Sequence, residues 1–231
     1  MAGQRPGVMG VQGARADWQS GTWAFVTRLG GTDGSEPHPF SAALAGGRAN
    51  ARDLSDAVHA ICAVHGQLPG LADEALVRCV QPDAAAWLEA IAEGFASERA
   101  YLALLAAAVG PVPSTPAQAQ TETALIGARH AIEMLAKSER VGCATGAIAA
   151  LVADWPAIRR VLDRAALRAM LADAYAGFDH IAVAPLSQLG DNLFLLELFH
   201  GPTLAFKDLA MQLLGRLMQH VLAARGQRAT I

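Results

Sequence analysis

One lysine stands at a position where its amine could carry out covalent chemistry. The chain has 18 lysine and arginine residues, of which only Lys137 and Lys207 are lysines. Lys207 lies in the segment FLLELFHGPTLAFKDLAMQLLG, residues 194–215, between an aromatic residue and an acid. Lysine, unlike arginine, can lose its proton when it is buried and can then form a Schiff base with an aldehyde. The use of lysine at this position therefore suggests amine chemistry.

The expected place of Lys207 on a helix supports this interpretation. Thr203 is predicted to be the N-cap of a helix, after a Gly-Pro pair that turns the backbone out of a strand. In the first turn, the positive end of the helix dipole and the apolar neighbours Leu204 and Phe206 would disfavour the ammonium form of Lys207. The same helix end could attract an anion. The alternative is an ordinary lysine at a helix start whose ammonium extends into solvent.

A second candidate is a carboxylate–histidine metal site in the helical part of the chain. His130 and Glu133 are three residues apart and would share a helix face, as ligands on bundle helices do. Glu98, Glu122 and His59 could add further ligands. Di-iron bundle sites, however, use the order Glu-x-x-His and use it twice, which this chain does not. Ordinary polar positions and surface ion pairs explain these residues more simply, so we expect no metal.

The helical part extends from residue 51 to residue 166. Apolar residues recur there at the spacing of a helix face, and proline and glycine separate about five segments. The predicted helices begin near residues 51, 82, 121, 142 and 155. Asp154 is expected to cap the last of them, with Pro156 in its first turn. This pattern predicts an antiparallel helical bundle.

The two flanking segments follow different patterns. Residues 1–50 are rich in glycine and are predicted to be a poorly ordered leader, in which Trp23, Phe25, Val26 and Leu29 form a short strand or dock on the bundle. Residues 167–231 begin as a helix and turn at Pro185 and Gly190. The run NLFLLELF, residues 192–199, then fits a strand buried on both faces.

A helix from Thr203 to Arg225 and a second strand at 227–231 would complete a right-handed crossover unit of a parallel sheet. The predicted fold class is therefore mainly α, with an N-terminal helical bundle followed by a truncated α/β segment.

Composition excludes several other classes of protein. A net charge of −3 gives no basic surface for nucleic acid. The longest uncharged stretch, residues 101–121, is interrupted by glycine and prolines, so we expect no membrane span. The N-terminus has no apolar core typical of a signal peptide. Cys62, Cys79 and Cys143 are widely spaced, which suggests reduced thiols in a cytoplasmic protein.

The segment from residue 167 to 231 resembles threonine synthase, a pyridoxal-phosphate enzyme of fold type II. The resemblance lies in AYAGFDH, PLSQLGDNLFLLELFHGPT and LAFKDLAMQLLGRL. That family converts O-phosphohomoserine and water to threonine and phosphate, and the lysine of this motif holds the cofactor as a Schiff base. The resemblance implies that Lys207 is the catalytic and cofactor-binding residue, with pyridoxal 5'-phosphate as the cofactor and O-phosphohomoserine as the substrate. Residues 1–165 resemble no family of known function.

The departures from the family pattern lead to three hypotheses. The chain lacks the N-terminal YxSTRG-like motif, and it ends before the SGDTG-like loop, the glycine-rich phosphate loop and the partner of the ring nitrogen. It could therefore be an inactive threonine synthase-like fragment. Alternatively, it is a non-catalytic helical binding or scaffold module fused to an enzyme fragment. The third hypothesis is a product of truncation or a shifted reading frame. The oligomeric state cannot be deduced from the sequence.

Overall fold

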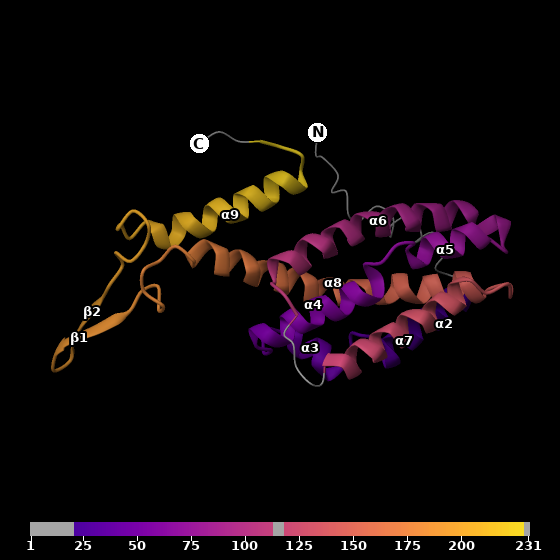
Figure 1. Ribbon diagram of the computed structural model, residues 1–231, viewed down its shortest axis with the longest axis horizontal. Helices are drawn as coiled ribbons and strands as arrows, with labels where there is room; N and C mark the ends of the chain where they lie inside the picture. The colour runs from indigo at the N-terminus through magenta and orange to yellow at the C-terminus, as the bar shows by residue number, and fades with distance from the viewer. Residues whose placement is uncertain (1–20, 113–117, 229–231) are drawn as a thin grey trace. The chain divides into compact units, whose positions relative to one another are not determined.

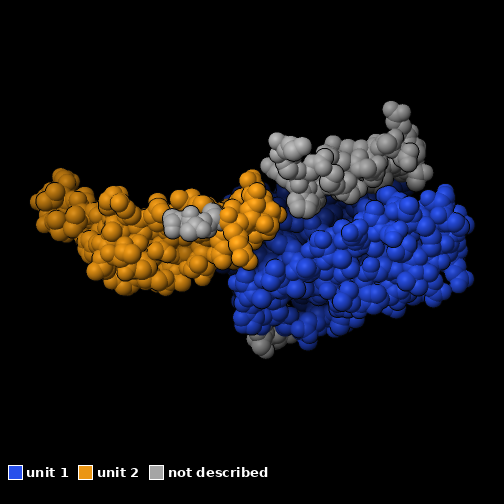
Figure 2. Space-filling model, turned by 90° about the horizontal axis from the view of Figure 1, so that it is seen from above, with its two compact units in different colours: residues 1–165 blue, residues 166–231 orange. Residues whose placement is uncertain are grey.

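The computed structural model describes residues 21–112 and 118–228 of the 231-residue chain. Figure 1 shows the course of the chain, and Figure 2 shows its division into two compact units, residues 1–165 and 166–231. The described part is mainly helical, as the sequence predicted. None of its helices is long and apolar enough to cross a membrane.

Unit 1 contains seven α-helices among the described residues, together with one turn of 3-10 helix. The elements are α2 (Gly21–Asp33), α3 (Pro39–Ala45), α4 (Ala51–His65), α5 (Leu71–Arg78), η2 (Pro82–Ala84), α6 (Ala85–Ala108), α7 (Gln118–Ala136) and α8 (Cys143–Tyr175), of which the last continues into unit 2. Helices α4 and α5 each pack against both α6 and α7 (Figure 1).

The core of unit 1 joins α5, α6 and α8 with the end of α7. Its main cluster contains Leu71, Ala72, Ala75, Leu88, Ile91, Ala92, Ala136, Ala144, Ile148 and Val152. Leu88 and Ile148 are almost completely buried, and burial of such a side chain contributes about 1.5–3 kcal/mol to folding. Small alanines between the large side chains allow the helices to approach closely. The predicted bundle is thus present and has a continuous apolar core.

Three local predictions for unit 1 are wrong. Within residues 21–45, predicted to have little order, α2 and α3 are formed, and Phe25, Val26 and Leu29 lie in α2 rather than in a strand. The alternative, that these three residues dock on the bundle, stays a prediction. Residues 1–20 lie outside the described part. Helix α5 was not predicted. It begins where the Asp73 carboxylate accepts a 2.8 Å hydrogen bond from the backbone N–H of Gly70. An ion pair between Arg99 and Asp73, 2.9 Å long, holds this start against α6.

The third error concerns the helix break at Asp154. Helix α8 runs without interruption through Pro156, although proline removes one backbone donor there. The Asp154 carboxylate accepts hydrogen bonds from the backbone N–H of Ser35 at 2.7 Å and from the Ser35 hydroxyl at 2.6 Å. Asp154 therefore anchors the connection between α2 and α3 and does not cap a helix.

Unit 2 contains a β-hairpin and a helix after the end of α8. Strands β1 (Leu186–Gly190) and β2 (Leu193–Leu196) pair antiparallel, with Leu186 opposite Leu196. Helix α9 extends over Asp208–Ala224, with Arg225 as its C-cap and Gly226 at a φ of +61°. The predicted end of this helix is confirmed, whereas the predicted N-cap Thr203 lies four residues before the observed N-cap Lys207.

The predicted parallel crossover is not seen among the described residues, and most of its second strand, predicted at residues 227–231, lies outside them. Residues 186–190, between the turns expected at Pro185 and Gly190, form β1, which pairs directly with β2. A connection of only Asp191 and Asn192 suffices because antiparallel neighbours can be joined by a tight turn. Asn192 adopts a φ of +60°, a left-handed conformation that asparagine tolerates in turns. All four residues of β2 are exposed rather than buried. Of residues 227–231, only 227 and 228 are described, and neither lies in a strand.

Candidate functional site

The segment before α9 is organised around the carboxylate of Asp208. Asp208 is 4% exposed, and its Oδ2 accepts hydrogen bonds from the backbone N–H of Thr203 at 2.8 Å and from the Thr203 hydroxyl at 2.9 Å. Burial alone would raise the pKa of Asp208, but the hydrogen bonds from Thr203 and Gln212 outweigh it and lower that pKa. The prediction that Thr203 caps the helix is therefore wrong, because Asp208 is the acceptor and Thr203 the donor.

The same turn requires a glycine at residue 201. A Cβ added at Gly201 would lie 2.4 Å from Cβ of Asp208 and 2.5 Å from its Oδ2. Leu204, in the middle of the turn, adopts a φ of +59°, a region that a branched side chain rarely occupies. A 2.8 Å hydrogen bond from the Tyr175 hydroxyl to the carbonyl of Leu209 ties the first turn of α9 to the end of α8. The turn of residues 201–208 is thus compact and strained.

Lys207 is the N-cap residue of α9, in helical conformation with φ −61° and ψ −27°. Its side chain is exposed, and Leu204 and Phe206 are 70% and 65% exposed. The prediction that these two apolar neighbours desolvate Lys207 is wrong for the described residues, because both side chains face solvent. Among those residues Lys207 takes part in no ion pair. Lys137 instead forms a 3.1 Å ion pair with Glu74.

These residues fit only part of what pyridoxal phosphate would need. The primary amine of Lys207 is accessible and unengaged among the described residues, which suits covalent attachment. The nearby donors of Thr203 are already occupied by Asp208. They would have to be released before they could hold a phosphate group at this helix end.

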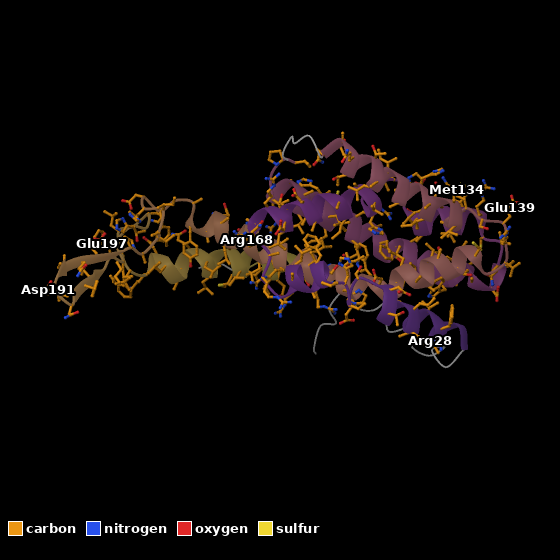
Figure 3. The ribbon with its side chains drawn as sticks, turned by 90° about the horizontal axis from the view of Figure 1, so that it is seen from below. Arg28, Met134, Glu139, Arg168, Asp191 and Glu197 are labelled. Atoms are coloured by element: carbon orange, nitrogen blue, oxygen red, sulfur yellow. The ribbon has the colours of Figure 1, made fainter. Side chains whose placement is uncertain are left out.

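A charged cluster that the sequence analysis missed lies next to this turn. His200 contacts two carboxylates, with Nδ1 2.5 Å from Oδ1 of Asp179 and Nε2 2.7 Å from Oε2 of Glu197. The other oxygen of Glu197 accepts a 2.5 Å hydrogen bond from the Ser187 hydroxyl. Figure 3 shows Glu197 toward the base of the hairpin and Asp191 at its tip. The spacing Glu-x-x-His before Gly-Pro was the only sequence signal for this cluster, since Asp179 is remote in the chain.

The five residues considered for a metal site are not brought together. Glu98 accepts hydrogen bonds from Nη1 of Arg159, the longer of them 2.9 Å. The ring of His59 contacts the carbonyl of Gly110. Glu122 pairs with a neighbouring glutamine, and His130 is exposed. The described residues contain no group of three potential ligands that could hold a metal ion.

The fifth of these residues, Glu133, belongs to a buried arginine contact. Arg129 donates from Nε to Glu133 at 2.7 Å, from Nη1 to the carbonyl of Val64 at 2.9 Å and from Nη2 to the carbonyl of Pro69 at 2.7 Å. The hydrogen bond from Arg129 is the main reason why the pKa of Glu133 is lowered. Arg129 therefore connects α7 to the last turn of α4 and to the chain between α4 and α5.

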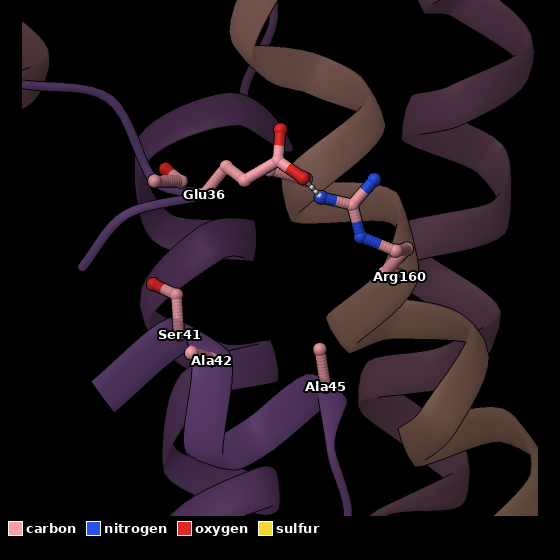
Figure 4. Close-up of a pocket in the computed structure, with 7 residues that line it drawn as sticks. Glu36, Ser41, Ala42, Ala45 and Arg160 are labelled. Carbon is pink, nitrogen blue, oxygen red and sulfur yellow. Dashed lines mark hydrogen bonds and ion pairs between the residues drawn. The ribbon is translucent and has the colours of Figure 1, made fainter. Parts of the chain in front are cut away.

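A small pocket lies in unit 1 beside α3 and α8. Its volume is about 190 Å³, and its lining includes Ser35, Ser41, Ala157, Glu36 and Arg160. Glu36 and Arg160 form a 2.7 Å ion pair at its rim (Figure 4). Because the two charges neutralise each other, the pocket has no excess charge to select an ionic ligand.

Part of the chain matches threonine synthases. The threonine synthase of Pseudomonas aeruginosa is 64% identical over 62 residues, which are 27% of this chain and 13% of that protein. The threonine synthase of Methylobacillus glycogenes is 45% identical over 83 residues, 35% of this chain and 18% of the relative. For Corynebacterium glutamicum the identity is 38% over 99 residues, 43% of this chain and 20% of the relative. The resemblance seen in the sequence is confirmed as a partial match, and the chain spans a fifth or less of these relatives.

A different match covers the larger part of the chain. No solved structure gives a significant match. A model of a family of unknown function, DUF6975, matches residues 30–182, from α2 through α8 to the loop before β1. This range includes the whole apolar core of the bundle. Since the match covers more than half of its residues, the chain belongs to the family of unknown function DUF6975.

Proposed function

We propose that unit 2 carries the lysine segment of a threonine synthase-like site, and that Lys207 is the residue that attaches pyridoxal 5'-phosphate. The observation that carries this proposal is the exposed primary amine of Lys207 at the start of α9, within the LAFKD motif. The 64% identity to a threonine synthase over 62 residues supports it. The implied substrate is O-phosphohomoserine, and the implied reaction is that of a lyase in threonine biosynthesis.

The roles of the individual residues follow from the turn before α9. When bound, the cofactor would act as an electron sink for bonds at the substrate α-carbon. Lys207 would bond to it through Nζ. Asp208 would hold Thr203 and thereby the backbone that presents Lys207. Because its charged form is favoured, Asp208 would keep this role at neutral pH.

We further propose that this chain by itself attaches the cofactor weakly and does not convert O-phosphohomoserine. The matched segment corresponds to 13–20% of the length of the relatives. A bound phosphate needs several converging donors, and the two donors of Thr203 are engaged by Asp208. A single Schiff base to an exposed lysine is reversible, so attachment should require millimolar rather than micromolar cofactor. A dissociation constant in the millimolar range corresponds to a binding free energy of about 4 kcal/mol.

The test is to incubate the full chain with pyridoxal 5'-phosphate, reduce it with borohydride and locate the modified peptide by mass spectrometry. We expect modification at Lys207 to exceed that at Lys137, whose amine is paired with Glu74. Lys207→Arg keeps the charge but cannot form a Schiff base, so it should abolish the main product. Lys137→Arg is the matched control and should leave that product unchanged. Modification mainly at Lys137 or at the N-terminal amine would refute the proposal.

A second candidate function is a non-catalytic helical binding module. It is favoured by the family match, which covers the bundle over residues 30–182 and does not reach Lys207. Under this alternative, the cofactor would neither label Lys207 selectively nor raise the temperature of thermal unfolding of the chain. A cytoplasmic location is proposed for either function, because Cys62, Cys79 and Cys143 are free thiols.

A further inference from the structure

His200 is held on both sides of its ring by carboxylates. Its Nδ1 lies 2.5 Å from Oδ1 of Asp179, and its Nε2 lies 2.7 Å from Oε2 of Glu197. The side chain is only 14% exposed, whereas that of Asp179 is 68% exposed. The ring of Phe199 stacks on the imidazole with centroids 4.8 Å apart, and the ring of His180 lies 5.2 Å away. The imidazole is therefore confined to one orientation.

This arrangement determines the protonation state of His200. An ionised carboxylate can only accept hydrogen bonds, so each ring nitrogen that contacts one must donate. A neutral imidazole has a single N–H, and two donating nitrogens therefore require the imidazolium. The hydrogen bonds to Glu197 and Asp179 correspondingly raise the pKa of His200 above its ordinary value.

The cluster also connects segments that are distant along the chain. The backbone N–H of Asp179 donates to the carbonyl of His200 at 3.0 Å. Glu197 is fixed by the Ser187 hydroxyl of β1 and by its own N–H, which donates to the carbonyl of Pro185 at 2.9 Å. His200 thus joins the loop after α8, the base of the hairpin and the chain that enters the turn at Gly201.

The turn that follows His200 needs to be held in place. Leu204 is in the strained left-handed region, and Gly201 packs directly on Asp208. A strained backbone persists only where surrounding contacts enforce it. Asp208 holds the distal side of the turn through Thr203. On the proximal side, Gly201 follows His200, which is fixed by the two contacts of its ring and by the hydrogen bond from the Asp179 N–H to its carbonyl.

We propose that His200, as an imidazolium bound between Asp179 and Glu197, is a positioning residue that fixes the turn of residues 201–208 and thereby the place of Lys207. The inference rests on the proposed function of Lys207, but its structural part can be tested without the cofactor. If His200 loses its proton, one ring nitrogen presents a lone pair to a carboxylate, and attraction is replaced by repulsion. Three charged or titratable groups face the ring: Asp179, Glu197 and His180.

The direction of the pH effect follows from the raised pKa of His200. The stabilisation is complete at a pH below the ordinary value for a histidine, and it is lost as the pH rises through the higher value of the folded chain. The order of the turn should therefore decrease as the pH rises above the ordinary value for a histidine. The raised pKa is attributable first to Glu197 and then to Asp179.

The first measurement is amide hydrogen exchange of the full chain at pH 7, followed by mass spectrometry. In His200→Gln, which cannot donate on both sides, peptides covering residues 201–208 should exchange about tenfold faster, because the turn loses the hydrogen bonds that fix it on the side of His200. His220→Gln, at an exposed histidine of α9, is the matched control and should exchange like the wild type. Unchanged exchange of residues 201–208 in His200→Gln would overturn the inference.

A second variant covers the case in which His200→Gln unfolds unit 2 entirely. In Glu197→Gln one carboxylate is replaced by an amide, so a neutral His200 can satisfy both sides. Intrinsic base catalysis accelerates amide exchange about tenfold per pH unit, and an unstructured peptide of the same sequence measures this baseline. In the wild type, exchange of residues 201–208 should accelerate by more than this baseline as the pH rises from 7 to 9. In Glu197→Gln that excess should disappear. The same excess in both proteins would overturn the inference.

Cofactor trapping then separates the two proposals. If Lys207 is labelled in the wild type, His200→Gln should reduce labelling at Lys207 relative to Lys137, and an unchanged ratio would count against positioning. If Lys207 is not labelled in the wild type but the exchange results hold, the proposed function fails while the role of His200 in fixing the turn stands.

Discussion

The rings of His65 and Trp155 meet edge to face in the bundle, with their centroids 5.4 Å apart. Phe95 packs against the same indole at 4.8 Å. Within the described residues, neither Nδ1 of His65 nor Nε1 of Trp155 has a hydrogen-bond partner, although both atoms are buried. Burial lowers the pKa of His65 to about 4, and the positive charge of Arg129 contributes to this shift.

This contact predicts acid destabilisation of the bundle. A lowered pKa means that stability is complete above the ordinary value of 6.5 and is lost as the pH falls toward about 4. The loss attributable to His65 should amount to about 3 kcal/mol. Urea unfolding between pH 7 and pH 4 should therefore show a smaller pH dependence for His65→Phe than for the wild type. His130→Phe, at an exposed histidine, is the control, and a pH dependence equally reduced in it would contradict the prediction.

Arg129 should be far more important for stability than a surface arginine. Its side chain is 5% exposed and satisfies two backbone carbonyls and Glu133. Arg129→Met leaves these acceptors without their donor, and we expect a loss of about 3 kcal/mol in the free energy of unfolding. Arg52→Met removes an exposed pair with Asp56 and should cost less than about 1 kcal/mol. Equal losses in urea unfolding would show that the buried contacts contribute little.

Substitution of two glycines of unit 2 by alanine should change the stability of the structure around them in opposite directions. Gly201→Ala places a methyl group against Asp208 and should displace the turn before α9. Gly215→Ala, in the middle of α9, meets nothing within 4 Å and should stabilise the helix by about 0.5–1 kcal/mol. Hydrogen exchange of the first turn of α9 is the measurement. Slower or unchanged exchange in Gly201→Ala would mean that the turn can relax around the added group.

The hairpin should drive self-association of the chain. Phe194 and Leu195 lie on opposite faces of β2 and are 53% and 44% exposed. Exposed apolar strands with free edges pair with one another. Phe194→Lys with Leu195→Lys should therefore shift sedimentation toward the monomer. Ile126→Lys, at a single exposed apolar residue of α7, should leave the distribution unchanged, and the same shift in this control would point to a general effect of charge.

We propose from the sequence that residues 51–166 form an independent domain. Limited chymotrypsin digestion should then cut first at exposed phenylalanines of unit 2, such as Phe194 and Phe199, and leave a stable helical fragment. Far-UV circular dichroism of that fragment should retain the helical signal of α4 to α8. Simultaneous loss of the bundle and unit 2 would contradict two-part organisation.

The sequence by itself determined the helical segments with strong periodicity. The apolar spacing of residues 51–65 and the Pro82 start of the next helix correspond to α4, η2 and α6. It also determined the Gly226 end of α9. These features depend on residues within one or two turns of each other, so local pattern suffices to predict them.

Tertiary structure alone decided the features that join distant residues. The local sequence around Asp154 predicts a helix cap, but its carboxylate binds Ser35, 119 residues away. Glu133 reads as a possible ligand, but Arg129 engages it on α7 while binding the carbonyl of Val64. At the candidate site, the sequence predicted a role for Lys207, whereas the pairing of His200 with Asp179 required the folded loop. A local pattern does not show which residue pairs with a charged group, because the packing of segments that are distant in the chain determines that partner.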